Sequence, residues 1–375
     1  MIPFNKPYLT GKETHYIEEA ARMGKLSGNG MFTQKCQAYF ENKYGFKKTL
    51  LTTSCTDALE MCAILADIKA GDEVIVPSYT FVSTAVAFVR QGAKIIFADS
   101  YSDNPNINAD AVESLITPRT KAIVPVHYAG VACDMDKIMA LADKYNLIVI
   151  EDAAQAIDSY HKGKPLGTIG HLSAFSFHET KNISAGEGGL LGINDERFVE
   201  RAEIIWEKGT NRAEFFRGET NKYNWVDIGS SFLPSEVTAA FLWAQLENIA
   251  AIQAKRFALW NVYYNGLKDL AAKGRVRLPQ IPYFASNNGH IFYITLENLE
   301  ERDNLITTLK NANIHAVFHY ISLHSSPFYI SYHDGRALPN SDYFTNTLVR
   351  LPLFFDLEIE DITTKILPII GQLYA

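Results

Sequence analysis

The stretch that decides the fold is LIVIEDAAQ, at residues 147–155. Four apolar residues are followed at once by two carboxylates, a pattern typical of a buried strand that ends at a polar site. Further apolar runs and segments of helical pattern alternate in the preceding part of the chain, at residues 74–76, 81–91, 95–98, 122–126 and 135–145. Apolar strands that alternate with helices in this way predict an α/β protein with a mostly parallel sheet covered by helices on both faces.

Residues 209–234 separate this α/β region from a different architecture. The segment is rich in Arg, Asn, Gly and aromatic residues and has no clean period, and a loop of that length in a compact protein is usually functional or disordered. A helical segment at 236–252 follows, and then shorter strand and helix patterns at residues 290–296, 301–311, 316–320 and 359–373. We therefore predict a large domain over residues 1–252 and a smaller C-terminal α+β domain over residues 253–375.

The composition is that of an ordinary globular protein. Of the 375 residues, 47% are hydrophobic and 21% are charged, which suffices for two substantial cores. The formal net charge of −7 and the lack of a basic run argue against binding to nucleic acid or to a membrane surface. The four cysteines form no CxxC pair, and no stretch has the apolar character of a signal peptide or a membrane span. These features predict a cytoplasmic protein with free thiols.

Lys181 lies in a second informative stretch, FSFHETKN at residues 175–182. A lone lysine is usually a solvated surface charge, but the aromatic and small neighbours favour partial burial, which promotes the neutral, nucleophilic amine. An apolar strand that ends in Asp152, followed by such a lysine, is expected of an enzyme that binds pyridoxal phosphate (PLP) as a Schiff base. We predict that Lys181 forms this bond and that a carboxylate at the end of the strand pairs with the pyridine nitrogen.

Other side chains near predicted strand ends suit the same cofactor. The turn Ser54-Cys55-Thr56 opens an apolar helix, so its backbone N–H groups and hydroxyls could bind a phosphate, although a plain helix N-cap is the simpler explanation of the turn alone. Ser176, five residues before the lysine, could reach that phosphate, and Phe81 could stack on the pyridine ring unless it belongs to the core. Ligands of parallel sheets bind past the carboxyl ends of the strands.

Other chemistries find little support in the sequence. The chain has neither a GxGxxG nor a Walker motif, which disfavours dinucleotide and P-loop chemistry, and no hydrolase triad or nucleophile elbow is evident. His315, His319 and His324 are close in sequence. Residues 316–318 between the first two have the pattern of a strand, which would separate their side chains. We therefore predict no metal site.

Four motifs resemble those of a known family, namely PSYTFVST, PVHYAG, EDAAQA and SFHETKN, at residues 77–84, 125–130, 151–156 and 176–182. Over nearly its whole length the chain resembles the DegT/DnrJ/EryC1/StrS sugar aminotransferases, which are PLP enzymes of fold type I. The resemblance implies a homodimer with shared active sites that moves an amino group from L-glutamate to a nucleotide-linked ketosugar. We expect the acceptor to be the C4 ketone of dTDP-4-dehydro-6-deoxy-D-glucose. The same chemistry on another nucleotide sugar or at C3, and a non-catalytic sensor that keeps the fold, stay open as alternatives.

The resemblance also assigns roles to individual residues. Lys181 would shuttle a proton between the substrate carbon and the aldehyde carbon of the cofactor, and Asp152 would pair with the pyridine nitrogen. The cofactor would be held by a group of six side chains, namely Cys55, Thr56, Phe81, Asp152, Gln155 and Ser176. Ser231 replaces an Asn that, in most of the family, reaches the cofactor phosphate of the neighbouring subunit.

The substrate contacts are expected in two later segments. In residues 209–234, Arg212 and Arg217 could pair with the diphosphate of the nucleotide or remain solvated surface charges. In AVFHY, at residues 316–320, His319 and Tyr320 are expected to face the substrate. We expect the first of these segments to discriminate most strongly between sugar nucleotides.

Overall fold

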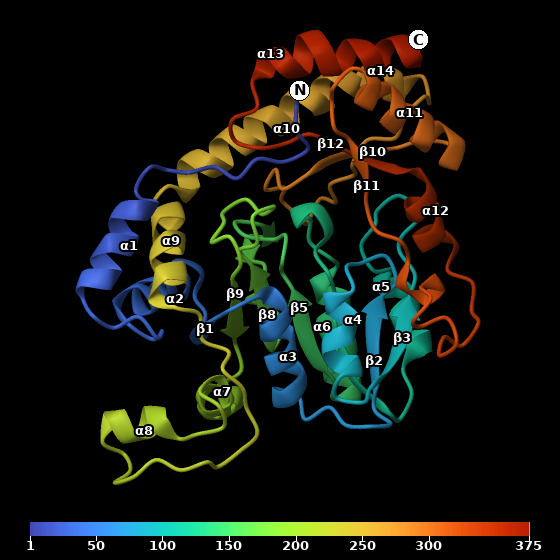
Figure 1. The fold of residues 1–375 in the computed structure, drawn as a ribbon. Helices are drawn as coiled ribbons and strands as arrows, with labels where there is room; N and C mark the ends of the chain where they lie inside the picture. The colour runs from blue at the N-terminus through green and yellow to red at the C-terminus, as the bar shows by residue number, and fades with distance from the viewer. Residues whose placement is uncertain (375) are drawn as a thin grey trace.

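The computed structural model describes residues 1–374 and centres on a seven-stranded sheet with the order β1-β9-β8-β5-β4-β2-β3 (Figure 1). Its strands are β1 (Lys48–Thr52), β2 (Glu73–Pro77), β3 (Lys94–Ala98), β4 (Thr120–Ile123), β5 (Ile148–Asp152), β8 (Leu172–Ser176) and β9 (Gly189–Ile193). All neighbours are parallel except those of β9, which runs antiparallel to both β1 and β8. A small hairpin follows β5, formed by β6 (Tyr160–His161) and β7 (Lys164–Pro165). The predicted α/β class with a mostly parallel sheet is confirmed.

Helices cover both faces of this sheet. They are α1 (Glu13–Arg22), α2 (Met31–Tyr44), α3 (Cys55–Leu65), α4 (Ser83–Val89), α5 (Ala109–Val112), α6 (Met135–Tyr145), α7 (Val199–Trp206) and α9 (Glu236–Glu247). A further short helix, α8 (Arg212–Arg217), lies away from the sheet (Figure 1). Alternate side chains of a strand point to opposite faces. Val74 and Val76 therefore share a core with α3, α4 and α7, whereas Ile75 packs with α5 and α6 on the other face.

A second sheet, three-stranded and antiparallel in the order β10-β12-β11, lies at the other end of the molecule (Figure 1). This region contains α10 (Ile249–Ala272), β10 (Phe292–Thr295), α11 (Leu299–Asn311), β11 (Val317–Phe318), α12 (Pro339–Thr347), β12 (Leu348–Leu351), α13 (Ile359–Asp361) and α14 (Leu367–Leu373). Val349 faces a core of its own with α10 and α11. Leu348, on the opposite face, clusters with Tyr79 and Tyr128. These tyrosines follow β2 and β4, so the small sheet packs over the carboxyl ends of the large one.

Two predicted elements differ from the structure. The helix expected over 236–252 is broken at Asn248, where a φ of −109° and a ψ of 6° leave the helical region, so that α9 ends and α10 begins. The strand expected over 316–320 is shortened to Val317–Phe318, and Tyr320 adopts a positive φ of 51° that no strand contains. The domain boundary predicted at residue 252 falls within α10 and stays a prediction. Within residues 1–374, no helix is long enough and apolar enough to cross a bilayer.

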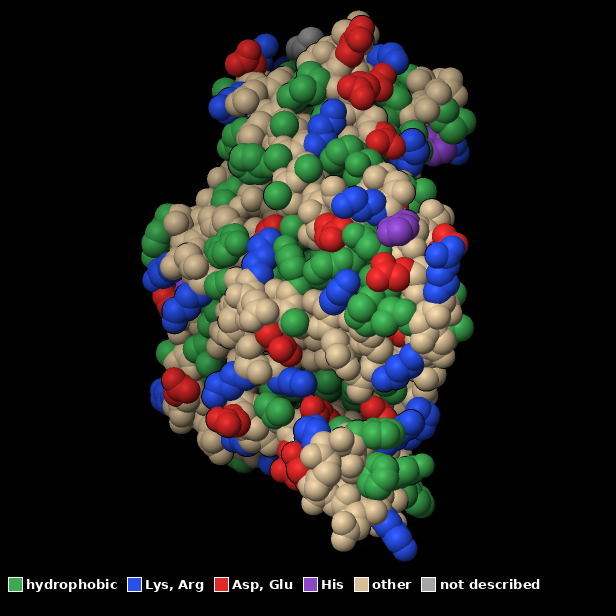
Figure 2. Space-filling model, turned by 90° about the vertical axis from the view of Figure 1, so that its left-hand side faces the viewer, with side chains coloured by type: hydrophobic (Ala, Val, Ile, Leu, Met, Phe, Trp, Pro, Cys, Tyr) green, Lys and Arg blue, Asp and Glu red, His purple; other side chains and the backbone are tan. Residues whose placement is uncertain are grey.

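Residues 207–231 form an arm that projects beyond α7 (Figure 1). Bridges between Glu207 and Ser231 and between Thr210 and Trp225 close the arm, and α8 lies within it. Figure 2 views the molecule from this side and shows the arm as a lobe at the lower end, with apolar side chains among charged ones. The segment without sequence periodicity is therefore a hydrogen-bonded and largely exposed structure.

Candidate active site

Lys181 lies beyond the carboxyl end of β8, in the turn that leads to β9. Its backbone N–H donates to the carbonyl of His178 at 2.9 Å, and the N–H of Phe177 donates across the turn to Gly188 at 2.8 Å. The Lys181 side chain is half-buried. Burial lowers the pKa of its amine, although the nearby charge of Asp152 opposes the shift. A larger share of the amine is therefore neutral and nucleophilic than for a lysine in water.

Asp152 is the last residue of β5, the strand beside β8. The carboxylate is buried, and it accepts hydrogen bonds from the hydroxyl of Thr84 at 2.7 Å and from the N–H of Ala154 at 3.1 Å. Burial raises the pKa of Asp152, whereas these bonds and the charge of Lys181 favour its ionised form. The parallel order of β5 and β8 therefore brings one acid and one amine to the same edge of the sheet.

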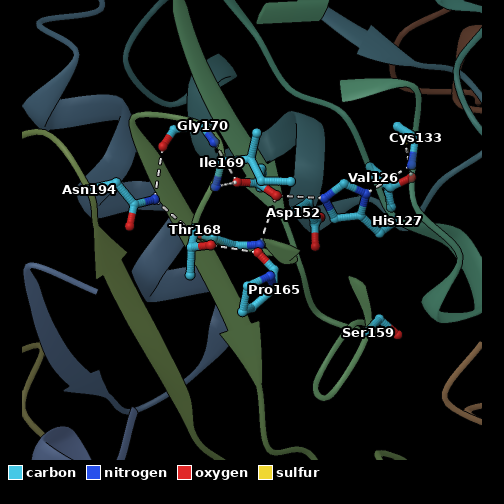
Figure 3. A network of polar contacts seen from close by, with 12 residues as sticks. Val126, His127, Cys133, Asp152, Ser159, Pro165, Thr168, Ile169, Gly170 and Asn194 are labelled. Carbon is cyan, nitrogen blue, oxygen red and sulfur yellow. Dashed lines mark hydrogen bonds and ion pairs between the residues drawn. The ribbon is translucent and has the colours of Figure 1, made fainter. Parts of the chain in front are cut away.

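A buried network fixes the backbone behind Asp152 (Figure 3). Glu151 accepts hydrogen bonds of 2.6–2.8 Å from three backbone N–H groups, those of Gly167, Ile169 and Gly170. His127 accepts at Nδ1 from the N–H of Cys133, so Nε2 carries the proton and donates to Glu151 at 2.9 Å. Burial alone would raise the pKa of Glu151, but these bonds lower it. Sequence reasoning assigns no role to either residue, although two adjacent carboxylates in a buried strand imply that one needs internal partners.

The residues predicted to hold a phosphate gather where α3 begins. The sheet register brings them together, because Gly189 on β9 pairs with both Thr52 on β1 and Ser176 on β8. A Cβ atom at Gly189 would collide with the carbonyl of Ser54 and lie 2.5 Å from the amide nitrogen of Cys55. The absence of a side chain thus lets the strands approach the start of the helix, whose free N–H groups and hydroxyls can bind an anion.

An aromatic wall closes the other side of the site. Gln155 donates from Nε2 to the hydroxyl of Tyr320 at 2.9 Å, and the ring of Phe81, which is 57% exposed, lies 6.2 Å from that of Tyr320. The Nδ1 atom of His319 lies 2.7 Å from the hydroxyl of Tyr128. Burial holds the pKa of His319 well below its usual range, so its ring is neutral. His319 and Tyr320 therefore enter the site from beyond β11 as an uncharged surface.

Three predicted site residues lie in the arm or at its base, and two of them, Arg212 and Arg217, belong to α8, which projects away from the sheet (Figure 1). Arg217 pairs with Glu203 at 2.7 Å and with Glu219 at 2.9 Å. Arg212 stacks its guanidinium over an aromatic ring of the arm at 5.1 Å. Ser231 is exposed at the base of the arm. The carbonyl of the next residue, Phe232, accepts a hydrogen bond from the N–H of Thr53, in the turn that precedes α3. The other predicted residues come together around Lys181 and Asp152.

The gathered side chains suit PLP part by part. Asp152 offers a carboxylate to a protonated ring nitrogen, and Phe81 offers an exposed face for stacking. The start of α3, with Thr56 in its first turn, and the hydroxyl of Ser176 offer donors to a phosphate. Lys181 offers a partly neutral amine to an aldehyde. The donor set therefore fits each functional group of the cofactor.

Known proteins resemble the chain over its full length. A model of the DegT/DnrJ/EryC1/StrS aminotransferase family matches residues 7–367. The uncharacterized protein MJ1066 of Methanocaldococcus jannaschii is 33% identical over 370 residues, which cover 96% of this chain and 95% of that protein.

Solved structures extend the resemblance to the fold. DesV of S. venezuelae, in complex with a ketimine intermediate, is 28% identical with a TM-score of 0.90 and covers 100% of this chain and 98% of its own. The aminotransferase from Psychrobacter cryohalolentis is 27% identical with a TM-score of 0.92 and covers 99% of both chains. The predicted fold type, transaminase activity and cofactor are thereby confirmed. The chain belongs to the DegT/DnrJ/EryC1/StrS family of aminotransferases, which use PLP.

Proposed function

We propose that the protein transfers an amino group from L-glutamate to the C4 ketone of dTDP-4-dehydro-6-deoxy-D-glucose. The product would be a dTDP-4-amino-4,6-dideoxyhexose for a surface polysaccharide, such as O-antigen or enterobacterial common antigen. Four stretches support this substrate because they resemble the dTDP-4-amino-4,6-dideoxygalactose transaminase, namely EKGTNR, FFRG, DIGSS and AVFHY at residues 207–212, 215–218, 227–231 and 316–320. The observation that carries the activity is the half-buried amine of Lys181 near the buried carboxylate of Asp152.

The side chains of the site divide the chemistry among themselves. PLP, when bound, supplies an electron sink for the carbon that loses a proton. Asp152 holds the proton on the ring nitrogen, and the hydroxyl of Thr84 keeps the carboxylate in position. Lys181 Nζ takes up a proton at the substrate carbon and returns it, because burial leaves the amine partly neutral. Phe81 and Tyr320 would cover this side of the bound cofactor, and a single base on one face determines the configuration at C4.

We also propose that two copies form a homodimer with shared active sites. The arm carries large apolar side chains that the single chain leaves open, with Trp225 82% exposed and Phe216 69% exposed. Exposed apolar patches of this kind mark protein interfaces. A second copy packed against the arm would receive Arg212, Arg217 and Ser231 at its own active site, which would give the arm a function.

Borohydride reduction of the PLP-loaded enzyme, followed by peptide mapping, tests the covalent site. We expect the label on Lys181. The Lys181→Ala variant should carry no label and should lose the visible absorbance of the bound cofactor. A label at another lysine would contradict the proposed site.

Product NMR with the dTDP ketosugar and L-glutamate tests the substrate and the position of amination. An amine at C4 supports the proposal, and the same spectrum gives the gluco or galacto configuration. An amine at C3, or reaction with a different nucleotide sugar alone, would favour the same chemistry on that substrate. Failure to exchange amino groups with L-glutamate, in protein supplemented with PLP, would count for a non-catalytic sensor.

A further inference from the structure

Arg350 is a cation inside the protein that lacks a partner. It lies on β12, in register with Tyr293 on β10 and Val317 on β11. Its Nε atom is buried without a hydrogen-bond partner, and within residues 1–374 the guanidinium forms no ion pair. The ring of Phe4 lies 4.6 Å from its Cζ atom. The buried guanidinium of Arg256, by contrast, donates to three backbone carbonyls.

The side chain of Arg350 faces the active site. Alternate residues of a strand share a face, and Leu348, two residues earlier, clusters with Tyr79 and Tyr128. The charge of Arg350 reaches Lys181, whose pKa it helps to lower after the larger effect of burial. The two phenols cannot balance this charge, because burial raises their pKa values and keeps them neutral. An unbalanced buried charge is unfavourable, so an anionic ligand would stabilise this side of the site.

We propose that Arg350 binds a carboxylate of the amino donor and thereby selects an α-amino acid for the first half-reaction. The inference rests on the proposed function, which names L-glutamate as that donor. A planar guanidinium pairs with a carboxylate through two parallel hydrogen bonds, and the Nε–H of Arg350, which has no partner within the described residues, is available for such a bond. The Arg350 side chain is only partly buried, unlike that of Arg256.

The position suits the amino acid better than the sugar nucleotide. In an α-amino acid the carboxylate is attached to the carbon that carries the reacting nitrogen, so its counter-cation has to lie at the active site. Arg350 pairs with Tyr293, which packs with Tyr79 and Tyr128 at the carboxyl ends of β2 and β4. In the ketosugar the diphosphate is attached to C1, across the ring from the reacting C4. The phosphate of PLP has a separate set of donors at the start of α3.

The test compares Arg350→Gln and Arg350→Lys in the PLP-loaded enzyme, with each half-reaction measured in single turnovers. We expect Arg350→Gln to lower kcat/KM for L-glutamate by about 30-fold or more, as for the loss of one partner of a buried charge pair. Arg350→Lys should lose less of this kcat/KM, because lysine keeps the positive charge but cannot form the two parallel hydrogen bonds of a guanidinium. The reverse half-reaction, from the dTDP-amino sugar, should change by less than about 3-fold in both variants.

Arg277→Gln is the matched control. Arg277 belongs to the same small region, where it bridges to Thr295 on the edge strand β10 and lies 5.2 Å from the ring of Tyr343. We expect both of its half-reactions to match the wild type. All variants are first compared with the wild type in thermal unfolding and in the visible absorbance of the bound cofactor. Should Arg350→Gln fail to fold, Arg350→Lys decides, since a loss confined to the glutamate half-reaction supports the assignment and no loss overturns it.

Binding of glutarate gives a readout that needs no catalysis. Glutarate has both carboxylates of the donor and no amino group, and calorimetry should show it bound about 30-fold more weakly by Arg350→Gln than by the wild type. Three outcomes would overturn the role of Arg350 but leave the proposed function standing. They are equal losses in both half-reactions, a loss confined to the sugar half-reaction, and unchanged glutamate kinetics with unchanged glutarate affinity. A wild-type enzyme that binds PLP at Lys181 but exchanges no amino group with L-glutamate would refute the proposed function and this inference with it.

Discussion

Burial acts on the two reactive side chains in opposite senses. It raises the pKa of Asp152 and lowers the pKa of Lys181, because a poorly solvated site favours the neutral form of each. The acid therefore needs a cationic partner to remain ionised, and the amine is poised to react with a carbonyl. PLP offers both groups, a basic ring nitrogen and an aldehyde, so the same burial prepares both ends of the site for one cofactor.

Covalent capture of PLP by the apoenzyme should reveal the lowered pKa of Lys181. Only the unprotonated amine reacts, so the capture rate should rise with pH, with a midpoint below the value of about 10.4 for a free lysine side chain. Asp152→Asn should move the midpoint further down, because the charge of Asp152 favours protonated Lys181. Stopped-flow absorbance as a function of pH measures both effects. A midpoint at or above that of an Nα-acetyl-lysine control, whose ε-amine is free, would contradict the burial argument.

Asp152→Asn should separate cofactor capture from catalysis. The amide is similar in size and can keep the bond with Thr84, but it carries no charge to hold a proton on the ring nitrogen. We expect Lys181 to be labelled by borohydride as before, and the glutamate half-reaction to slow roughly 10²- to 10³-fold, as for a buried charge that loses its partner. Thr84→Val, which removes one hydrogen bond to the carboxylate, should slow it only about 10-fold. Wild-type rates in Asp152→Asn would refute the assigned role.

The elements that could be predicted from sequence are those marked by their own residues. β2 and β5 are apolar runs that end at polar turns, so their pattern alone defines buried parallel strands. β12 has four residues, one of which is Arg350, and nothing in so short a run indicates a strand or the face of its cation. α8 lies in a segment without apolar periodicity, because the arm buries no helix face in this chain.

The site, too, has residues that the sequence pattern marks and contacts that it does not mark. Asp152 could be predicted because it ends a recognisable apolar strand, and Lys181 because it lies within a family motif. The contact of His319 with Tyr128 joins residues from the two sheets, and the partners of Glu151 come from a distant turn. Such contacts depend on tertiary packing, which no local pattern encodes.

Gly189→Ala should disturb the start of α3. The new Cβ atom would collide with the carbonyl of Ser54, and overpacking of this kind lowers the free energy of unfolding by about 1–3 kcal/mol. Because the collision lies at the predicted phosphate site, PLP affinity should fall as well. Gly371→Ala is the control, since no atom lies within 4 Å of its Cβ position in α14 and alanine favours a helix by up to about 1 kcal/mol.

Thermal unfolding of the apoenzymes and titration with PLP measure these two effects separately. A Gly189→Ala protein with wild-type stability and wild-type PLP affinity would show that the close approach of β9 to α3 is dispensable. A loss of stability without a loss of affinity would remove the helix start from the cofactor site while leaving the packing argument in place.

At the scale of the whole molecule, the N-terminal segment ties the small sheet to the reactive turn. Ile2 donates its N–H to the carbonyl of Asn313, and the side chain of Asn5 donates to the carbonyl of Glu179 at 3.2 Å, two residues before Lys181. Phe4, between these anchors, lies under the guanidinium of Arg350. The segment therefore sets the position of the small sheet relative to the lysine, and with it the distance over which Arg350 can act on a ligand.

Replacing both Phe216 and Trp225 by Asp should dissociate the proposed homodimer. Aromatic anchors at an interface contribute about 2–4 kcal/mol each, so the loss of two should weaken the dimer by roughly 10³-fold or more, and light scattering should detect monomers. Tyr332→Asp is the matched control and should stay dimeric, because Tyr332 is also exposed, at 62%, but packs on Tyr329 beside β3 at the far edge of the sheet.

The activity of the same double variant separates the interface from the shared site. If Arg212 and Ser231 act in the partner's active site, monomers should lose PLP affinity and the sugar half-reaction together, since the phosphate and the nucleotide would each lose a contact. A double variant that remains dimeric would place the interface elsewhere on the molecule. A monomer with full activity would keep the arm as the interface but show that each chain completes its own site. The ion pairs of Arg217 with Glu203 and Glu219 would then be the functional state of Arg217.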